Sequence, residues 1–163
     1  MNTNNTDNRF SLTRFANVAH SNGSVLPFWL KLKKEGKALK LTDPNMNRLI
    51  FTQKDAAELI KRTIDYTKTD GGGFVMSYKM KCVNMLDLAK VISDDIEIVG
   101  KRPGEKTNED LISASEVERT YIHGNDILIR NEINLDANTL SSPYNSKTAE
   151  KMSKDEMKAL VWG

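Results

Sequence analysis

The sequence is poor in the residues that build covalent or metal-held frameworks. Of its 163 residues one is cysteine, Cys82, and two are histidine. An internal disulfide and a structural zinc site of the usual Cys/His type are therefore excluded. No apolar run approaches the roughly 20 residues that span a bilayer, and the opening Met1–Arg9 is polar where an export signal would be apolar. We therefore expect a cytoplasmic protein with no membrane segment and no bound metal.

Charge of one sign is also scarce. The chain has 24 Lys and Arg against 22 Asp and Glu, which gives a formal net charge of +2. The electrostatic field of so small a net charge is too weak to favour nucleic acid or an anionic membrane as partner. A chain of this length can bury one modest core. We expect one domain over residues 10–163, preceded by a disordered Asn/Thr-rich leader over residues 1–9.

Motifs for nucleotide cofactors and for common hydrolytic chemistry are missing. The glycines at 71–73 are followed by Phe74, Val75 and Met76, so the third glycine of a Gly-x-Gly-x-x-Gly turn is absent. None of the four tyrosines is followed by lysine four positions later, and there is no P-loop, His-Glu-x-x-His or Gly-x-Ser-x-Gly. The chain alone is predicted to supply no catalytic residue of these kinds and to bind no cofactor.

Strand-like and helix-like patterns alternate along the chain. Apolar spacing of three and four residues predicts helices over 25–35, 52–66 and 84–92, a short one over 107–113, and a last one opening at a capping box over 153–156. Extended patterns predict strands within 10–18, 37–42, 49–51, 74–78, 96–99 and 121–133. This alternation predicts an α/β layered domain, with α+β as the open alternative.

Three positions have the chemistry to hold an anion. Residues 21–24 precede the helix that carries Trp29, where free N–H groups and the helix dipole favour phosphate. Arg102 lies in the turn 101–106 after a strand, with its guanidinium fork available. Arg48 precedes an apolar strand and places a second guanidinium at a sheet edge. The alternatives are an ordinary helix cap, a solvated turn and surface charge.

Five segments together resemble a known family. In chain order they are Thr13–Val18, Ser21–Phe28, Leu41–Arg48, Ile98–Lys106 and Tyr144–Ser146. Their order and spacing resemble the UDP-N-acetylglucosamine 4,6-dehydratase/5-epimerase branch of the extended short-chain dehydrogenase/reductases, which includes the polysaccharide biosynthesis proteins. The resemblance covers almost the whole chain but only the family's C-terminal half, the substrate-binding portion without the dinucleotide-binding Rossmann half.

The resemblance implies a site for a UDP-sugar. In such enzymes the position of Asn17 lies near the sugar and the nicotinamide, although Ala16 stands where the family usually has glycine. Ser24 and Val25 line the nucleotide side.

It also implies a clamp for the diphosphate. Arg48 and Arg102 occupy the positions of pyrophosphate-binding arginines, with Asn47 in place of the usual threonine, and Glu105 matches the glutamate that accepts hydrogen bonds from the ribose. Two arginines on one pyrophosphate make charge-assisted contacts.

Three functions stay open at this point. The first is the UDP-sugar-binding half of a nucleotide-sugar dehydratase/epimerase of surface polysaccharide biosynthesis, catalytically incomplete alone. The second is one subunit of a split enzyme whose partner chain supplies the Rossmann half and NAD(P). The third is a non-enzymatic remnant reused as a homo-oligomeric binding or assembly module, because removal of a nucleotide domain exposes apolar surface.

Overall fold

The computed structural model describes residues 9–133 and 138–163. These residues form two compact units, each built from three separated segments of the chain. The first unit takes the described parts of segments 1–15, 54–79 and 111–144, and the second takes 16–53, 80–110 and 145–163. The predicted leader lies outside the described residues except for Arg9, and the single domain over 10–163 stays a prediction.

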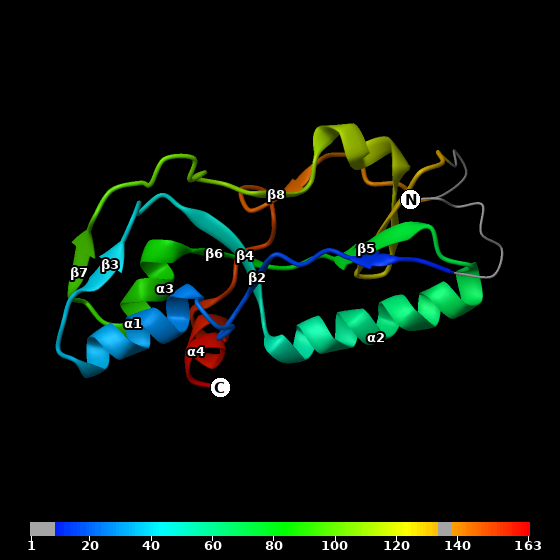
Figure 1. Ribbon diagram of the computed structural model, residues 1–163. Helices are drawn as coiled ribbons and strands as arrows, with labels where there is room; N and C mark the ends of the chain where they lie inside the picture. Colours follow the sequence, from blue (N-terminus) through cyan, green and yellow to red (C-terminus); the bar gives the residue numbers. More distant parts are fainter. Residues whose placement is uncertain (1–8, 134–137) are drawn as a thin grey trace. The chain divides into compact units, whose positions relative to one another are not determined.

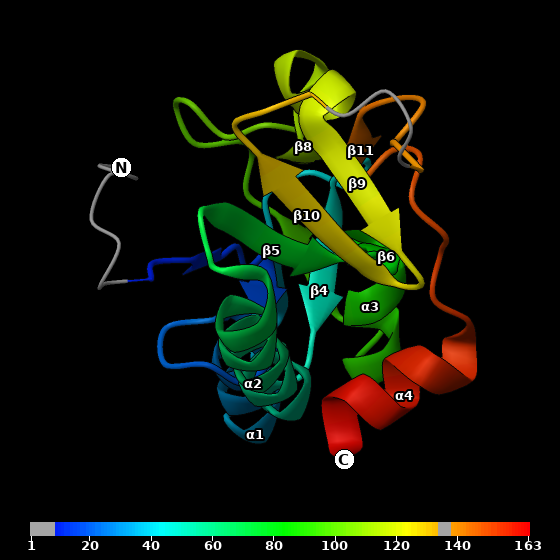
Figure 2. The same cartoon turned by 90° about the vertical axis from the view of Figure 1, so that its right-hand side faces the viewer.

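The first unit is a mixed sheet with a long helix packed on it. The strand order is β1 (Leu12–Thr13), β5 (Phe74–Tyr78), β10 (Asp126–Arg130), β9 (Thr120–His123). β1 runs parallel to β5, and the other neighbours are antiparallel. Helix α2 (Gln53–Asp70) lies below β5, where Figure 2 shows it end-on, and its Leu59 joins Phe74, Met76 and Leu128 in a buried cluster.

Helix α2 buries a different face from the one that its sequence pattern marks. Ala56, Ile60 and Ile64 recur at every fourth residue and predict the helix, but Ile60 is 44% and Ile64 is 50% exposed. The buried residues of α2 are Leu59 and Thr63. Ile60 and Ile64 therefore form an apolar stripe on this helix that the described residues cover only by about half.

The second unit combines two small sheets with three helices. One sheet has the order β2 (Asn17–Val18), β4 (Asn47–Phe51), β6 (Cys82–Asn84), and the other pairs β3 (Leu39–Leu41) with β7 (Ile96–Ile98). The helices are α1 (Val25–Lys34), α3 (Met85–Ile92) and α4 (Lys154–Trp162), and α3 packs against both α1 and α4 (Figure 1). Their buried side chains form one core, which includes Leu26, Trp29, Leu39, Leu88 and Leu160.

Local capping explains where α3 and α4 begin. The Asn84 side chain accepts hydrogen bonds from the N–H groups of Leu86 and Asp87, and Ser153 and Glu156 form the predicted capping box. Cys82 is fully buried, and burial raises the pKa of its thiol, so it is a core residue. No helix in the described ranges is both long and apolar enough to cross a membrane.

The predicted helix over 107–113 is wrong. That stretch contains a strand, β8 (Asp110–Ile112), which pairs with β11 (Tyr144–Asn145), and a 3-10 helix follows over Ala114–Arg119. The Thr107 carbonyl accepts the N–H of Asn47 (2.9 Å) instead of a later N–H of its own segment. This contact with a distant strand keeps residues after Thr107 extended, and the capping residue is Ser113.

Candidate functional site

Strands β2 and β4 place Asn17 and Arg48 in the second unit. β2 pairs in parallel with β4, with Asn17 opposite Ile50, and β4 pairs antiparallel with β6, with Arg48 opposite Val83. Arg48 is only 8% exposed. A buried guanidinium needs hydrogen-bond acceptors around it, so the groups that accept from Arg48 indicate its role.

The Arg48 guanidinium holds the segment 106–109 against β4. Its Nη1 donates to the carbonyl oxygens of Asn47 (2.9 Å) and Thr107 (3.3 Å), and its Nη2 donates to that of Lys106 (2.9 Å). Its Nε lies 3.2 Å from Oε1 of Glu109. All three nitrogens of the fork are therefore engaged within the protein.

Glu109 links Arg48 to Asn17. The Asn17 Nδ2 donates to Oε2 of Glu109 (3.1 Å) and to the carbonyl of Leu49 (2.9 Å). Sequence reasoning missed Glu109. Nothing in the sequence around Glu109 marks it, because Arg48, the buried arginine whose counter-charge it supplies, lies about 60 residues away in the chain.

A second set of contacts fixes the same loop from its other end. Lys101 Nζ lies 2.8 Å from Oδ2 of Asp43 and donates to Oγ1 of Thr107. The hydrogen bond from Lys101, and next the N–H of Asn45, hold the pKa of Asp43 below its usual range. The turn after β3 and the loop that carries Arg102 are thus joined by an ionised carboxylate at neutral pH.

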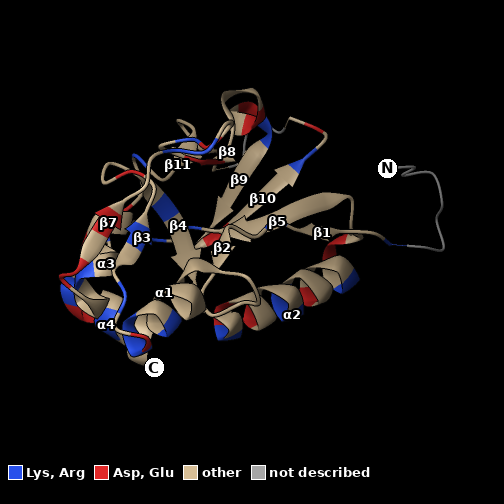
Figure 3. Ribbon diagram, turned by 60° about the vertical axis from the view of Figure 1, so that its left-hand side comes forward, with Lys and Arg blue, Asp and Glu red and all other residues tan. Residues whose placement is uncertain are grey.

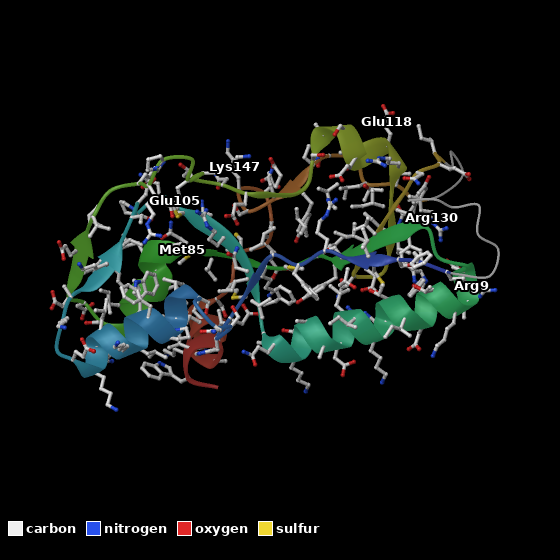
Figure 4. The ribbon with its side chains drawn as sticks, in the orientation of Figure 1. Arg9, Met85, Glu105, Glu118, Arg130 and Lys147 are labelled. Atoms are coloured by element: carbon white, nitrogen blue, oxygen red, sulfur yellow. The ribbon has the colours of Figure 1, made fainter. Side chains whose placement is uncertain are left out.

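Arg102 and Glu105 form the turn of that loop, on which Figure 4 labels Glu105. Glu105 Oε2 accepts the backbone N–H of Arg102 (3.1 Å), and the N–H of Glu105 donates to the Arg102 carbonyl (3.1 Å). The Arg102 side chain is exposed, and its guanidinium has no hydrogen-bond partner in the part of the chain that the structure describes. Arg48 binds the loop a few residues further on, so the three predicted residues share one substructure without contacting one another's side chains.

The start of α1 carries a buried hydroxyl with no partner. Ser24 is the N-cap residue, and its side chain makes no capping hydrogen bond. Its Oγ is the one buried side-chain oxygen or nitrogen without a hydrogen-bond partner in the described ranges. A capping serine accepts from the second or third helical N–H; the third residue here, Pro27, has none, and the N–H of the second, Leu26, does not donate to Ser24. Val25 is half-buried and packs against the core.

The glycines 71–73 do not fit a dinucleotide. They lie between α2 and β5, so they connect a helix to a strand, whereas a phosphate-binding turn leads from a strand into a helix. Gly72 has φ +82°, and a Cβ there would lie 2.8 Å from the carbonyl oxygen of Phe10. Close packing on the Phe10 backbone, just before β1, accounts for this glycine. In the described ranges, no group of three His, Cys, Asp or Glu side chains is placed to hold a metal ion.

The chain is similar in sequence to parts of several longer proteins. A family model described as polysaccharide biosynthesis protein matches residues 1–131. The chain is 32% identical, over 166 residues, to an uncharacterized membrane protein of Methanocaldococcus jannaschii; the match covers 93% of this chain and 49% of that protein. It is 34% identical, over 120 residues, to a UDP-N-acetylglucosamine 4,6-dehydratase (inverting) of Campylobacter jejuni subsp. jejuni serotype O:2, covering 72% of this chain and 35% of that protein.

A solved structure shows the same fold. The X-ray structure of Pen from Bacillus thuringiensis superimposes with a TM-score of 0.84 at 28% identity, covering 98% of this chain and 51% of the Pen chain. The chain therefore spans about a third to a half of the length of these relatives.

Proposed function

Because the chain belongs to the polysaccharide biosynthesis protein family, we propose that it binds a UDP-sugar and presents it for dehydration or epimerisation in surface polysaccharide biosynthesis. The family inferred from the sequence and the α/β fold class are both confirmed. One observation carries the proposal: the unpaired, buried Ser24 Oγ at the start of α1.

The start of α1 has the properties of a phosphate site. The N–H groups of Val25 and Leu26 open the helix and have no intrahelical acceptor, and the helix dipole adds partial positive charge there. A buried hydroxyl without a partner costs free energy unless a ligand completes its hydrogen bonding. A phosphate or ribose oxygen beside Ser24 would satisfy both the hydroxyl and the N–H groups.

The loop over 101–109 supplies the second part of the proposed site. The exposed guanidinium of Arg102 is available for a pyrophosphate, and the carboxylate of Glu105 for ribose hydroxyls. Arg48 can contact a phosphate only by giving up one of its carbonyl contacts. We therefore assign Arg48 first to positioning this loop, with Asn17 held beside it through Glu109.

In this function the chain binds and orients the UDP-sugar. Such positioning raises the reaction rate because it fixes the geometry of the reacting sugar. Hydride removal and return at the sugar need a nicotinamide, and residues 1–163 carry no Gly-x-Gly-x-x-Gly turn for one. NAD(P) would therefore be held by the portion of the relatives' length that these residues do not cover, and residues 1–163 alone would show no turnover.

Calorimetric titration of the chain with UDP and with uridine tests this function. We expect UDP to bind and uridine to bind much more weakly, because only UDP carries the diphosphate. Arg102→Gln should weaken UDP binding about tenfold or more, since it removes a charge-assisted contact. Arg130→Gln, which removes a partly exposed positive charge that is paired with Asp70 in the first unit, should bind as the unmodified chain does. Equal heats for UDP and uridine, or equal affinities for both variants, would refute the proposal.

A further inference from the structure

The backbone of His20 lies in the left-handed region. In the ranges that the structure describes, His20 is the one residue other than glycine with a positive φ, at 56°. A residue with a Cβ is strained in this conformation, and a protein keeps it only where the surrounding structure fixes it. Because such outliers gather at binding sites, the contacts that hold His20 indicate what the strained conformation does.

His20 lies in the turn over residues 19–24, which connects β2 to α1. The chain reverses just after it, because the Oγ of Ser21 donates to the Val18 carbonyl (2.8 Å) and the N–H of Ser24 donates to the Ser21 carbonyl (3.0 Å). Helix α1 begins at the next residue. The left-handed conformation of His20 thus sets where the first N–H groups of α1 lie.

Two hydrogen bonds hold His20 in place. Its imidazole Nε2 lies 2.8 Å from the Leu160 carbonyl oxygen, and its own carbonyl accepts from Nε2 of Gln53 (2.9 Å). A carbonyl oxygen can only accept, so Nε2 of His20 carries the hydrogen. Leu160 lies in the last turn of α4, where the carbonyl groups have no donor from their own helix. The imidazole therefore ties the turn to α4, while Gln53 fixes the peptide group that follows His20.

The turn itself carries no charged side chain. Residues 19–24 include no Lys, Arg, Asp or Glu, and the connection between β2 and α1 is accordingly tan in Figure 3. A phosphate at the start of α1 would be held by this segment through N–H groups and the Ser24 hydroxyl. Hydrogen bonds of this kind weaken steeply when their distance or angle changes. Binding here therefore requires that the turn keep one conformation.

We propose that His20 is a positioning residue of the UDP-sugar site. Anchored on the last turn of α4 through its imidazole, it holds the turn 19–24 in the strained conformation that presents the Ser24 hydroxyl and the first N–H groups of α1 to a phosphate oxygen. The inference rests on the proposed function for the identity of the ligand. Apparent affinity falls in proportion to the fraction of molecules in the binding conformation, so loss of the anchor weakens binding.

Two substitutions separate the anchor from the fold. His20→Gly removes the imidazole and adopts a positive φ without strain. His20→Asn keeps a side chain that tolerates the left-handed region but ends one bond short of the position of Nε2. His20 is exposed, so neither change leaves a cavity, and we expect melting temperatures within about 4 °C of the unmodified chain. His123→Asn is the matched control, because it makes the same change at the other histidine, in the first unit.

Calorimetry with UDP and amide exchange measured by NMR detect the anchor independently. We expect both His20 variants to bind UDP at least about fivefold more weakly than the unmodified chain and His123→Asn do. Without any ligand, the Ser24 amide should exchange with solvent at least about fivefold faster in the His20 variants. Unchanged UDP affinity in His20→Gly would overturn the proposal, and so would unchanged exchange at Ser24. A fall in affinity accompanied by a melting temperature lowered by more than about 10 °C would show a merely structural role.

The same measurements distinguish this inference from the proposed function. If the unmodified chain binds UDP and the His20 variants bind it equally well, the proposed function stands and the positioning role is wrong. If the unmodified chain binds no UDP, the proposed function fails, and the assignment of His20 to a UDP-sugar site fails with it, even where exchange at Ser24 still responds to His20→Gly.

Discussion

Replacement of Arg48 by lysine is expected to destabilise the second unit by about 3 kcal/mol. The guanidinium reaches three carbonyls and one carboxylate in fixed directions, and a lysine ammonium cannot reproduce that spread. Hydrogen bonds to a charged group contribute about 1.5–3 kcal/mol each. Loss of about two of the four contacts gives the expected value.

Arg102→Lys is the matched control for this change. It is the same substitution in the same unit, but the Arg102 guanidinium has no partner in the described structure, so stability should change by less than about 0.5 kcal/mol. Under the proposed function Arg102→Lys weakens UDP binding without destabilising the fold, whereas Arg48→Lys affects both.

Urea unfolding followed by tryptophan fluorescence measures both variants. Trp29 is buried in the second unit, where its Nε1 donates to the Lys40 carbonyl (2.9 Å), and Trp162 lies in the same unit. The signal therefore reports on the unit that contains Arg48. A loss below about 1 kcal/mol in Arg48→Lys, or an equal loss in Arg102→Lys, would refute the positioning role.

Three further changes test other parts of the structure. Ser24→Ala should leave stability within about 0.5 kcal/mol, because its hydroxyl has no partner, but should weaken UDP binding several-fold by calorimetry; unchanged affinity would contradict the site. Gly72→Ala should cost about 2 kcal/mol or more in thermal melts, since its Cβ would meet the Phe10 carbonyl, whereas Gly71→Ala, at φ +86° in open space, should cost only about 1 kcal/mol; equal losses would contradict the close packing. The hydrogen bond from Arg14 lowers the pKa of Glu116 to about 2. This carboxylate therefore adds about 3 kcal/mol above its unfolded pKa near 4.5, and that stability is lost as pH falls through 2. Urea titrations from pH 7 to 2, followed by circular dichroism, should show this fall and a weaker one in Glu116→Gln; parallel curves would contradict it.

Helix positions could be predicted because their signals are local. Asn84 caps α3 through N–H groups two and three residues ahead, and the capping box at Ser153 involves only Glu156. The segment after Thr107 was predicted as a helix and forms a strand, because its conformation depends on Asn47 and Arg48, about 60 residues away. Contacts at that separation leave no periodicity in the segment itself.

The candidate site could be predicted only in part for the same reason. The sequence marked Ser24, Arg48, Arg102 and Glu105 as residues of suitable chemistry, but neither the burial of Arg48 nor its engagement by three carbonyls can be read from residue type. Glu109 becomes recognisable only when β4 and the loop are brought together. The roles of the predicted residues in nucleotide binding stay predictions.

The interleaving of segments has a consequence for biosynthesis. The core of the second unit includes Ala19 and Leu26 from early in the chain and Leu160 and Val161 from its last helix, and the His20 ring bonds the Leu160 carbonyl across 140 residues. At roughly 5–20 residues per second, the ribosome needs about 7–28 s to synthesise the 140 residues between the earlier and the later partners. Throughout that interval the early apolar side chains lack these contacts, so the core of this unit is completed only after Leu160 and Val161 have been synthesised.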